Sequence, residues 1–190
     1  MNAEGLFNVL AAYHALSEDF KKALKKELIP LSLPKNHLLL EAPRIASHAF
    51  FLEKGFAMSY SFFNGKKVTE TFWRSGQIMV AFESFFEQTP SMGFIQLMRK
   101  SDVLCISYDS VQRMFELFPE AQRIYRGIMN RHYSQIHARI RDMQRLRASQ
   151  RLEKLLVTFP NIEMIVSQDA IASYLGITAQ SLARIKRKEE

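Results

Sequence analysis

The sequence contains a single cysteine, Cys105, among its 190 residues. One thiol cannot form an intrachain disulfide, and it excludes zinc or iron–sulfur sites built from several cysteines. The sequence also lacks a glycine-rich phosphate loop, a nucleophile elbow and a His-Glu-x-x-His motif. These absences exclude the enzyme classes that depend on such motifs, although catalytic groups can converge from distant positions. We therefore expect neither an enzyme nor a bound cofactor.

Long apolar runs are also absent, since none approaches the roughly 18 residues that a membrane span requires. The first residues, MNAEGLFNVLAAYHAL, have no basic segment before the apolar part. We therefore expect no secretory signal, no membrane partner and a cytoplasmic location. The 47% apolar and 24% charged composition is typical of globular proteins. A chain of this length forms one large domain or two small ones.

Acidic residues are scarce in the C-terminal part of the chain. Residues 1–120 contain 13 Lys and Arg against 13 Asp and Glu, whereas residues 121–190 contain 13 against 6. The net charge of +7 therefore resides near the C-terminus. This asymmetry indicates a neutral sensing or scaffolding part joined to a part that binds a polyanion, and a solvated basic face is the alternative.

The segment 168–188, QDAIASYLGITAQSLARIKRK, has the spacing of a helix-turn-helix. Apolar residues recur on one side of each short helix, and Gly176 between them permits a left-handed turn. Thr178 is suited to cap the second helix, as Ser167 is to cap the first, and Ala172 permits the helices to approach closely. The predicted DNA contacts are Thr178, Gln180, Ser181, Arg184, Lys186, Arg187 and Lys188. An ordinary pair of antiparallel helices is the alternative interpretation.

The segment from about 37 to 107 is rich in aromatic and branched residues in short runs. We expect strands at 37–40, 49–52, 56–63, 66–73, 78–80, 94–98 and 103–107. Asn64-Gly65 predicts a tight hairpin, because both positions of such a turn favour positive φ. Short strands with tight turns indicate an antiparallel sandwich or roll.

Helical patterns flank this region. Residues 6–28 are expected to be helical, with Ser17 as an N-cap and with Pro30 and Pro34 ending the helix. Other helices are expected over 109–118, 120–147 and 150–159. Residues 160–167 are expected to be a loop or a weak strand. Within 120–147, apolar residues recur at intervals of four and three, the seam of a two-stranded coiled coil. The predicted dimer contacts are Met129, Tyr133, Ile136, Ile140 and Met143. Packing of this helix on its own domain is the alternative.

The order of these parts resembles the Crp/Fnr family of bacterial transcription regulators over nearly the whole chain. The tail from Arg151, RLEKLLVTFPNI followed by VSQDAIASYLGITAQSLARIKRK, is similar to the Bacteroidetes-type branch. This resemblance implies an α+β fold: an antiparallel β-roll (a double-stranded β-helix of the cyclic-nucleotide-binding type), a long dimerisation helix and a C-terminal helix-turn-helix. The expected divisions are 1–119, 120–147 and 148–190. A homodimer, a two-fold-related operator and contact with RNA polymerase are also implied.

Two departures from the family pattern affect the expected function. Ala179 replaces an arginine that many members carry near the start of the recognition helix, which would relax or change the operator sequence. In SGQIMVAFESFFEQTPSMGFIQL, Gly76 precedes Gln77 rather than an acidic residue, and Pro90-Ser91-Met92 stands at the position of the phosphate-binding arginine. A buried phosphate would lack a charged partner, so we do not expect cyclic AMP to bind in the usual way.

Any effector is therefore expected to be apolar and to bind among the aromatic residues of the roll. The candidate ligand pocket comprises Gln77, Phe82, Phe85 and Ser91. A haem would need an axial histidine such as His37 or His48, which no flanking pattern supports. His132 and His137 are five apart, not the three or four of a helical metal pair, so they are expected on the surface or in the dimer seam, and no metal is expected.

The leading hypothesis is a dimeric DNA-binding transcription regulator. A ligand-binding or signalling module whose DNA binding has been lost is the alternative, favoured by Ala179 and by the end of the sequence at Glu190, which leaves no wing after the recognition helix.

Overall fold

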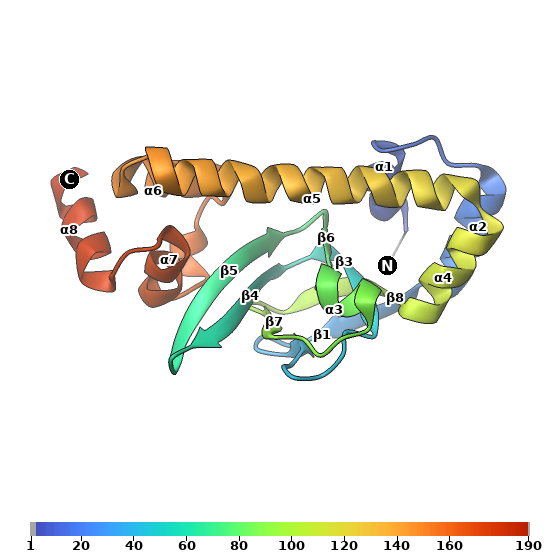
Figure 1. Ribbon diagram of the computed structural model, residues 1–190, viewed down its shortest axis with the longest axis horizontal. Helices are drawn as coiled ribbons and strands as arrows, with labels where there is room; N and C mark the ends of the chain where they lie inside the picture. The colour runs from blue at the N-terminus through green and yellow to red at the C-terminus, as the bar shows by residue number, and fades with distance from the viewer. Residues whose placement is uncertain (1–2, 190) are drawn as a thin grey trace.

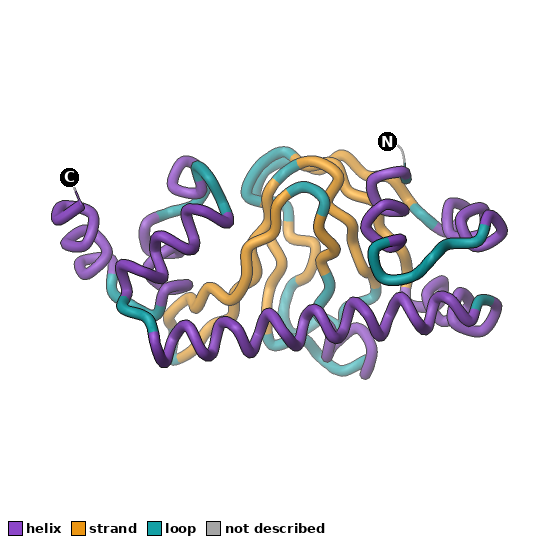
Figure 2. Tube along the Cα trace, turned by 90° about the horizontal axis from the view of Figure 1, so that it is seen from above, coloured by secondary structure: helices purple, strands orange, loops and turns teal. Residues whose placement is uncertain are grey.

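A long helix and two β-sheets determine the architecture of this computed structural model, which describes residues 3–189, the last two as backbone only. Helix α5 (Pro119–Arg145) runs along one side of the sheets, as the two views in Figures 1 and 2 show. Within the described residues, one sheet has the order β1 (Ile29–Leu33), β8 (Ser101–Ser107), β3 (His48–Lys54), β6 (Gln77–Met79). The other has the order β2 (Leu38–Leu40), β7 (Gly93–Leu97), β4 (Phe56–Phe63), β5 (Lys66–Arg74).

All paired strands are antiparallel, which confirms the predicted roll. Alternation along β3 divides its side chains between two cores. Phe50 and Leu52 pack between the sheets, whereas Phe51 packs outward against the N-terminal helices and α5. The hairpin at Asn64-Gly65 is confirmed by its φ angles of 50° and 73°.

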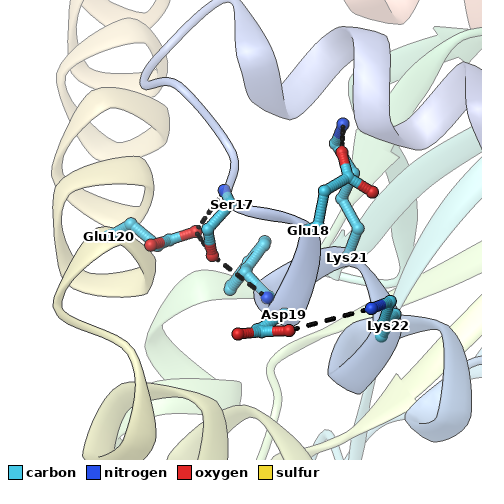
Figure 3. Close-up of polar contacts among 7 residues, drawn as sticks. Ser17, Glu18, Asp19, Lys21, Lys22 and Glu120 are labelled. Carbon is cyan, nitrogen blue, oxygen red and sulfur yellow. Dashed lines mark hydrogen bonds and ion pairs between the residues drawn. The ribbon is translucent and has the colours of Figure 1, made fainter.

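The N-terminal segment contains two helices, α1 (Glu4–Ala11) and α2 (Glu18–Glu27), so the single helix expected over 6–28 is wrong. Ser17 separates them because its hydroxyl accepts a hydrogen bond from the Phe20 amide at 3.1 Å and starts a new helix. The Ser17 amide and hydroxyl both donate to one carboxylate oxygen of Glu120, at 2.8 and 2.9 Å (Figure 3). These bonds attach the start of α2 to the start of α5.

Two elements were missed by the sequence patterns. Strand β1 contains Pro30, which was expected only to end a helix. Proline has no backbone N–H to donate to a neighbouring strand. It is tolerated in β1 because β1 lies at the edge of its sheet and pairs with β8 alone among the described strands. Helix α3 (Phe82–Glu87) forms in the aromatic stretch between β6 and β7.

The C-terminal helices follow the prediction within a few residues: α4 (Tyr108–Leu117), α5, α6 (Ala148–Thr158), α7 (Gln168–Leu175) and α8 (Ala179–Glu189). A short 3-10 helix, η1 (Ile162–Met164), lies within residues 160–167, where the sequence indicates a loop or a weak strand. None of the described helices combines the length and hydropathy needed to cross a membrane.

The roll and the C-terminal helices share one hydrophobic core. Phe72 of β5 lies 4.9 Å from the Tyr174 ring of α7 and 6.0 Å from the ring of Phe159, measured between centroids. Phe159 also contacts Phe56 of β4 at 5.7 Å. The edge of β5 is bonded as well, because the Thr69 amide donates to the Ser173 hydroxyl at 2.9 Å. The helix-turn-helix is thus fixed against the roll rather than attached by a free linker.

Candidate nucleic-acid interface

The turn between α7 and α8 has the geometry that the sequence predicts. Ser167 caps α7 by accepting from the Ala170 amide at 3.2 Å. Gly176 is left-handed, with φ of 68°, and the Ile177 amide closes the turn on the Ala172 carbonyl at 3.0 Å. Thr178 then starts α8, because its hydroxyl accepts from the Ser181 amide at 3.1 Å. Each predicted cap is confirmed.

Packing fixes which side of α8 faces solvent. Leu182 is fully buried in the core beneath the two helices, with Ile171, Ala172 and Leu175 of α7. The opposite side exposes Gln180, Arg184 and Arg187, which are four and three residues apart and therefore form one stripe along the helix. We call these three residues the exposed stripe. It presents one amide and two guanidinium groups on a helix whose back is anchored.

The other predicted DNA contacts have different surroundings. The Lys186 ammonium forms an ion pair with Glu163 and donates to the Gln168 side chain at 2.7 Å, so it holds α8 against η1 and α7. The Thr178 hydroxyl donates to that of Ser181 at 3.0 Å. The side chain of Lys188 lies outside the described residues.

Two arginines of the basic segment act inside the protein, which the charge count could not reveal. Arg151 of α6 donates to the Leu175 carbonyl at the end of α7, at 2.9 and 3.2 Å, and to the Leu146 carbonyl at 2.6 Å. Arg139 of α5 bonds the carbonyls of Glu70 and Tyr174, and its guanidinium lies 4.2 Å from the Tyr174 ring centroid. Both arginines therefore position the helix-turn-helix.

The predicted seam of α5 is largely uncovered. Tyr133, Ile136, Ile140 and Met143 are exposed by 64, 44, 46 and 41%, and Met129 is half-buried. These are large apolar side chains on one side of a 27-residue helix. Met143 additionally lies beside Gly176, so the C-terminal end of the seam adjoins the turn of the helix-turn-helix.

The four residues of the candidate ligand pocket do not form one site. Gln77 accepts from the Arg74 amide at 2.8 Å and stabilises a turn. Ser91 is buried, and its hydroxyl donates to the Gly93 carbonyl at 3.0 Å and accepts from the Gly93 amide at 3.1 Å. Phe82 and Phe85 instead line an apolar cavity of about 140 Å³ between the roll and the helices.

His132 is not the surface or seam residue that its spacing suggested. Its ring stacks on Phe82 of α3, with centroids 4.2 Å apart, and burial lowers its pKa. His137 is exposed and contacts the Tyr133 ring at 4.2 Å, within the seam. Among the described residues, no three His, Cys, Asp or Glu side chains are placed to hold a metal ion.

Comparison with known proteins identifies the fold. No family sequence model and no curated protein matches the chain by sequence. Solved structures do match, at 14% identity each: CLP, a c-di-GMP-responsive global regulator of Xanthomonas campestris (TM-score 0.70, 90% of this chain and 91% of that one) and FixK2 of Bradyrhizobium japonicum (0.69, 85% and 83%). A protein from Eubacterium rectale assigned to the Crp/Fnr family of transcriptional regulators matches with a TM-score of 0.76 over 95% of this chain and 87% of that one, also at 14% identity. CLP and the Eubacterium rectale protein are transcription regulators, and this chain shares their fold.

Proposed function

We propose that this chain is a dimeric transcription regulator that reads a two-fold-related operator through the recognition helix 179–188. The observation that carries the proposal is the exposed stripe on α8, held outward by the buried Leu182 and by the ion pair of Lys186 with Glu163. The fold shared with CLP and FixK2 supports it. The setting of this function is the cytoplasm, and RNA polymerase is the partner that the fold suggests.

The stripe has the chemistry of base and phosphate recognition. An arginine such as Arg184 can donate two hydrogen bonds to guanine, and Gln180 can both donate to and accept from adenine. Arg187 is suited to a phosphate, as is the Ser181 hydroxyl, whose own proton is not used by its bond from Thr178. Lys186 is excluded from this set because its charge is already paired.

Dimerisation would cover the exposed seam of α5. A helix of this length extends about 40 Å, so two copies packed in parallel would present two α8 helices from one end of the pair. Two-fold symmetry then requires half-sites about one helical turn of DNA apart.

Selection of bound sequences from random duplex DNA tests the proposal. We expect enrichment of a two-fold site, with affinity that falls steeply as salt is raised. Arg184→Ala should cost about 1–3 kcal/mol of discrimination at one base pair of each half-site, whereas Arg99→Ala, an exposed arginine in the turn before β8, should leave it unchanged. Recovery of a single asymmetric site, or of none, contradicts the proposal.

Dimerisation is tested separately by light scattering. Ile140→Asp should give a monomer, because it places a charge in an apolar seam. Ser134→Asp is the control, since Ser134 is exposed on another side of the same helix. A wild-type monomer at micromolar concentration would refute the seam.

The alternative, a signalling module that has lost DNA binding, has some support from Ala179. Its side chain is half-buried against the core beneath α8 rather than exposed for base contact. The double change Arg184→Glu and Arg187→Glu distinguishes the two functions, because it reverses the stripe without disturbing Lys186. Expression of target genes should change under the regulator hypothesis and remain the same under the alternative.

The roll is proposed not to bind cyclic AMP in the usual way. Ser91, at the position expected for a phosphate-binding arginine, is satisfied by the Gly93 backbone. Calorimetric titration with cyclic AMP should give no binding heat, and a micromolar dissociation constant would contradict this part of the proposal.

A further inference from the structure

The apolar cavity lies outside the roll, between a sheet and the helices that cover it. Side chains on the outer face of the β1-β8-β3-β6 sheet line one wall, among them Phe51 and Leu104. Residues of α1, α2, α3, α4 and α5 line the others, including Leu10, Met114 and Ile124. The core between the two sheets is filled by Leu52, Val103 and their neighbours, and Phe50 is the buried member of that core that also lines the cavity.

The lining determines what could occupy the cavity. Its walls are hydrocarbon and aromatic, with Tyr125 as the lone lining residue that bears a side-chain polar atom. A water molecule needs two to four polar partners to be stable in such a space, and these walls offer almost none. A charged ligand would find no counter-ion and no set of hydrogen-bond donors. The volume of about 140 Å³ is close to that of apolar cavities that bind benzene.

Aromatic rings connect this cavity to α5. Phe86 of α3 lies 4.6 Å from the Tyr125 ring of α5, and Phe115 of α4 lies 5.4 Å from the same ring. About two turns further along α5, His132 stacks on Phe82, which also lines the cavity. A molecule in the cavity would therefore contact both the roll and the helix that carries the proposed dimer seam.

We propose that this cavity is a binding site for a small, uncharged, apolar effector of about the size of benzene. A ligand bound there makes van der Waals contacts with the apolar walls. Its binding therefore favours the relative position of α3 and α5 in which the cavity is present. The binding step is independent of DNA. Its regulatory consequence, a change in the orientation or pairing of α5, rests on the proposed function.

Thermal unfolding of the full chain with benzene and with benzoate tests the site. Benzene at ten times its dissociation constant should raise Tm by about 3–5 °C, whereas benzoate, of similar shape but charged, should not. Ala121→Leu should abolish the benzene shift because Ala121 lines the cavity, is 6% exposed and would place three more carbons inside. Ala11→Leu is the matched control, since Ala11 is exposed at the end of α1.

If Ala121→Leu does not fold, Val111→Phe, which fills the cavity from α4, replaces it. The site is refuted if benzene gives no shift, if benzoate gives the same shift, or if the folded cavity-filling variant retains the shift. Titration of the protein with the selected operator, with and without benzene, then distinguishes binding in the cavity from an effect of that binding on DNA affinity. If benzene binds and the DNA affinity of the protein is unchanged, only the effector role is refuted. If the protein binds no DNA at all, the proposed function is refuted, but the evidence for ligand binding in the cavity is not affected.

Discussion

Arg151 and Arg187 are both basic residues of the C-terminal part, but we expect Arg151 to stabilise the fold and Arg187 to contact DNA. Arg151 makes three hydrogen bonds to the carbonyls of Leu175 and Leu146, at 2.6–3.2 Å. Both carbonyls lie at helix ends, where no further turn provides an amide. Hydrogen bonds to a charged group contribute about 1.5–3 kcal/mol each, but Arg151 is half-buried and water can replace part of that contribution.

We therefore expect Arg151→Met to lower the free energy of unfolding by about 2 kcal/mol, and Tm by about 4–8 °C for a chain of this size. Methionine keeps the apolar part of the side chain and removes the donors. Arg151→Lys should restore little of the loss, because one ammonium group cannot reach both carbonyls in this geometry. Differential scanning calorimetry and urea unfolding measure the change.

Arg187→Met should have the opposite profile. Arg187 is exposed, and its Nε donates to the Ala183 carbonyl of its own helix at 3.5 Å. Its replacement should alter stability by no more than about 0.5 kcal/mol and reduce the slope of log affinity for DNA against log salt by about 0.9 for each protomer bound. If Arg151→Met leaves Tm unchanged and reduces the salt slope instead, Arg151 is a phosphate contact and not a structural residue.

Three further predictions follow from particular contacts. Phe72→Ala should cost about 3–5 kcal/mol, and because the roll and the helix-turn-helix share the core around Phe72, near- and far-ultraviolet circular dichroism should still report one coincident transition; two separate transitions would show independent domains. Gly176→Ala should cost about 1 kcal/mol, because φ of 68° is unfavourable for any residue with a Cβ; an unchanged urea midpoint would contradict the left-handed turn. Burial lowers the pKa of His132, so the unfolded chain binds the proton more readily than the folded chain does. The free energy of unfolding should therefore be highest above about pH 6.5 and should decrease as the pH falls below it. Urea titrations between about pH 7 and 5 should show a smaller decrease for His132→Phe.

Sequence periodicity predicted the elements whose signals are local. The caps at Ser17, Ser167 and Thr178 and the turns at Asn64-Gly65 and Gly176 were all predictable, because a hydroxyl bonds an amide three residues away and positive φ is a property of single residues. The same kind of cap explains why residues 6–28 form two helices and not one continuous helix. The apolar pattern continued through a position where the Ser17 cap starts a second helix.

The exposed stripe was only partly predictable. Gln180, Arg184 and Arg187 face solvent as the helical period requires, since the buried Leu182 fixes the opposite side. Lys186 belonged to the same charged cluster in the sequence, yet it pairs with Glu163, which is 23 positions away. No local pattern could identify that partner.

The sequence by itself determined the succession of helices and strands, the antiparallel roll and the basic C-terminal part, because these depend on residue type and on spacing of a few positions. The tertiary structure alone decided which basic side chains bond other parts of the protein, that the aromatic rings of the roll form one core with the helix-turn-helix, and that an apolar cavity lies between one sheet and the helices that cover it. Those outcomes depend on contacts between residues far apart along the chain, such as Arg139 with Glu70 and Phe82 with His132, whose geometry is fixed only when the elements pack.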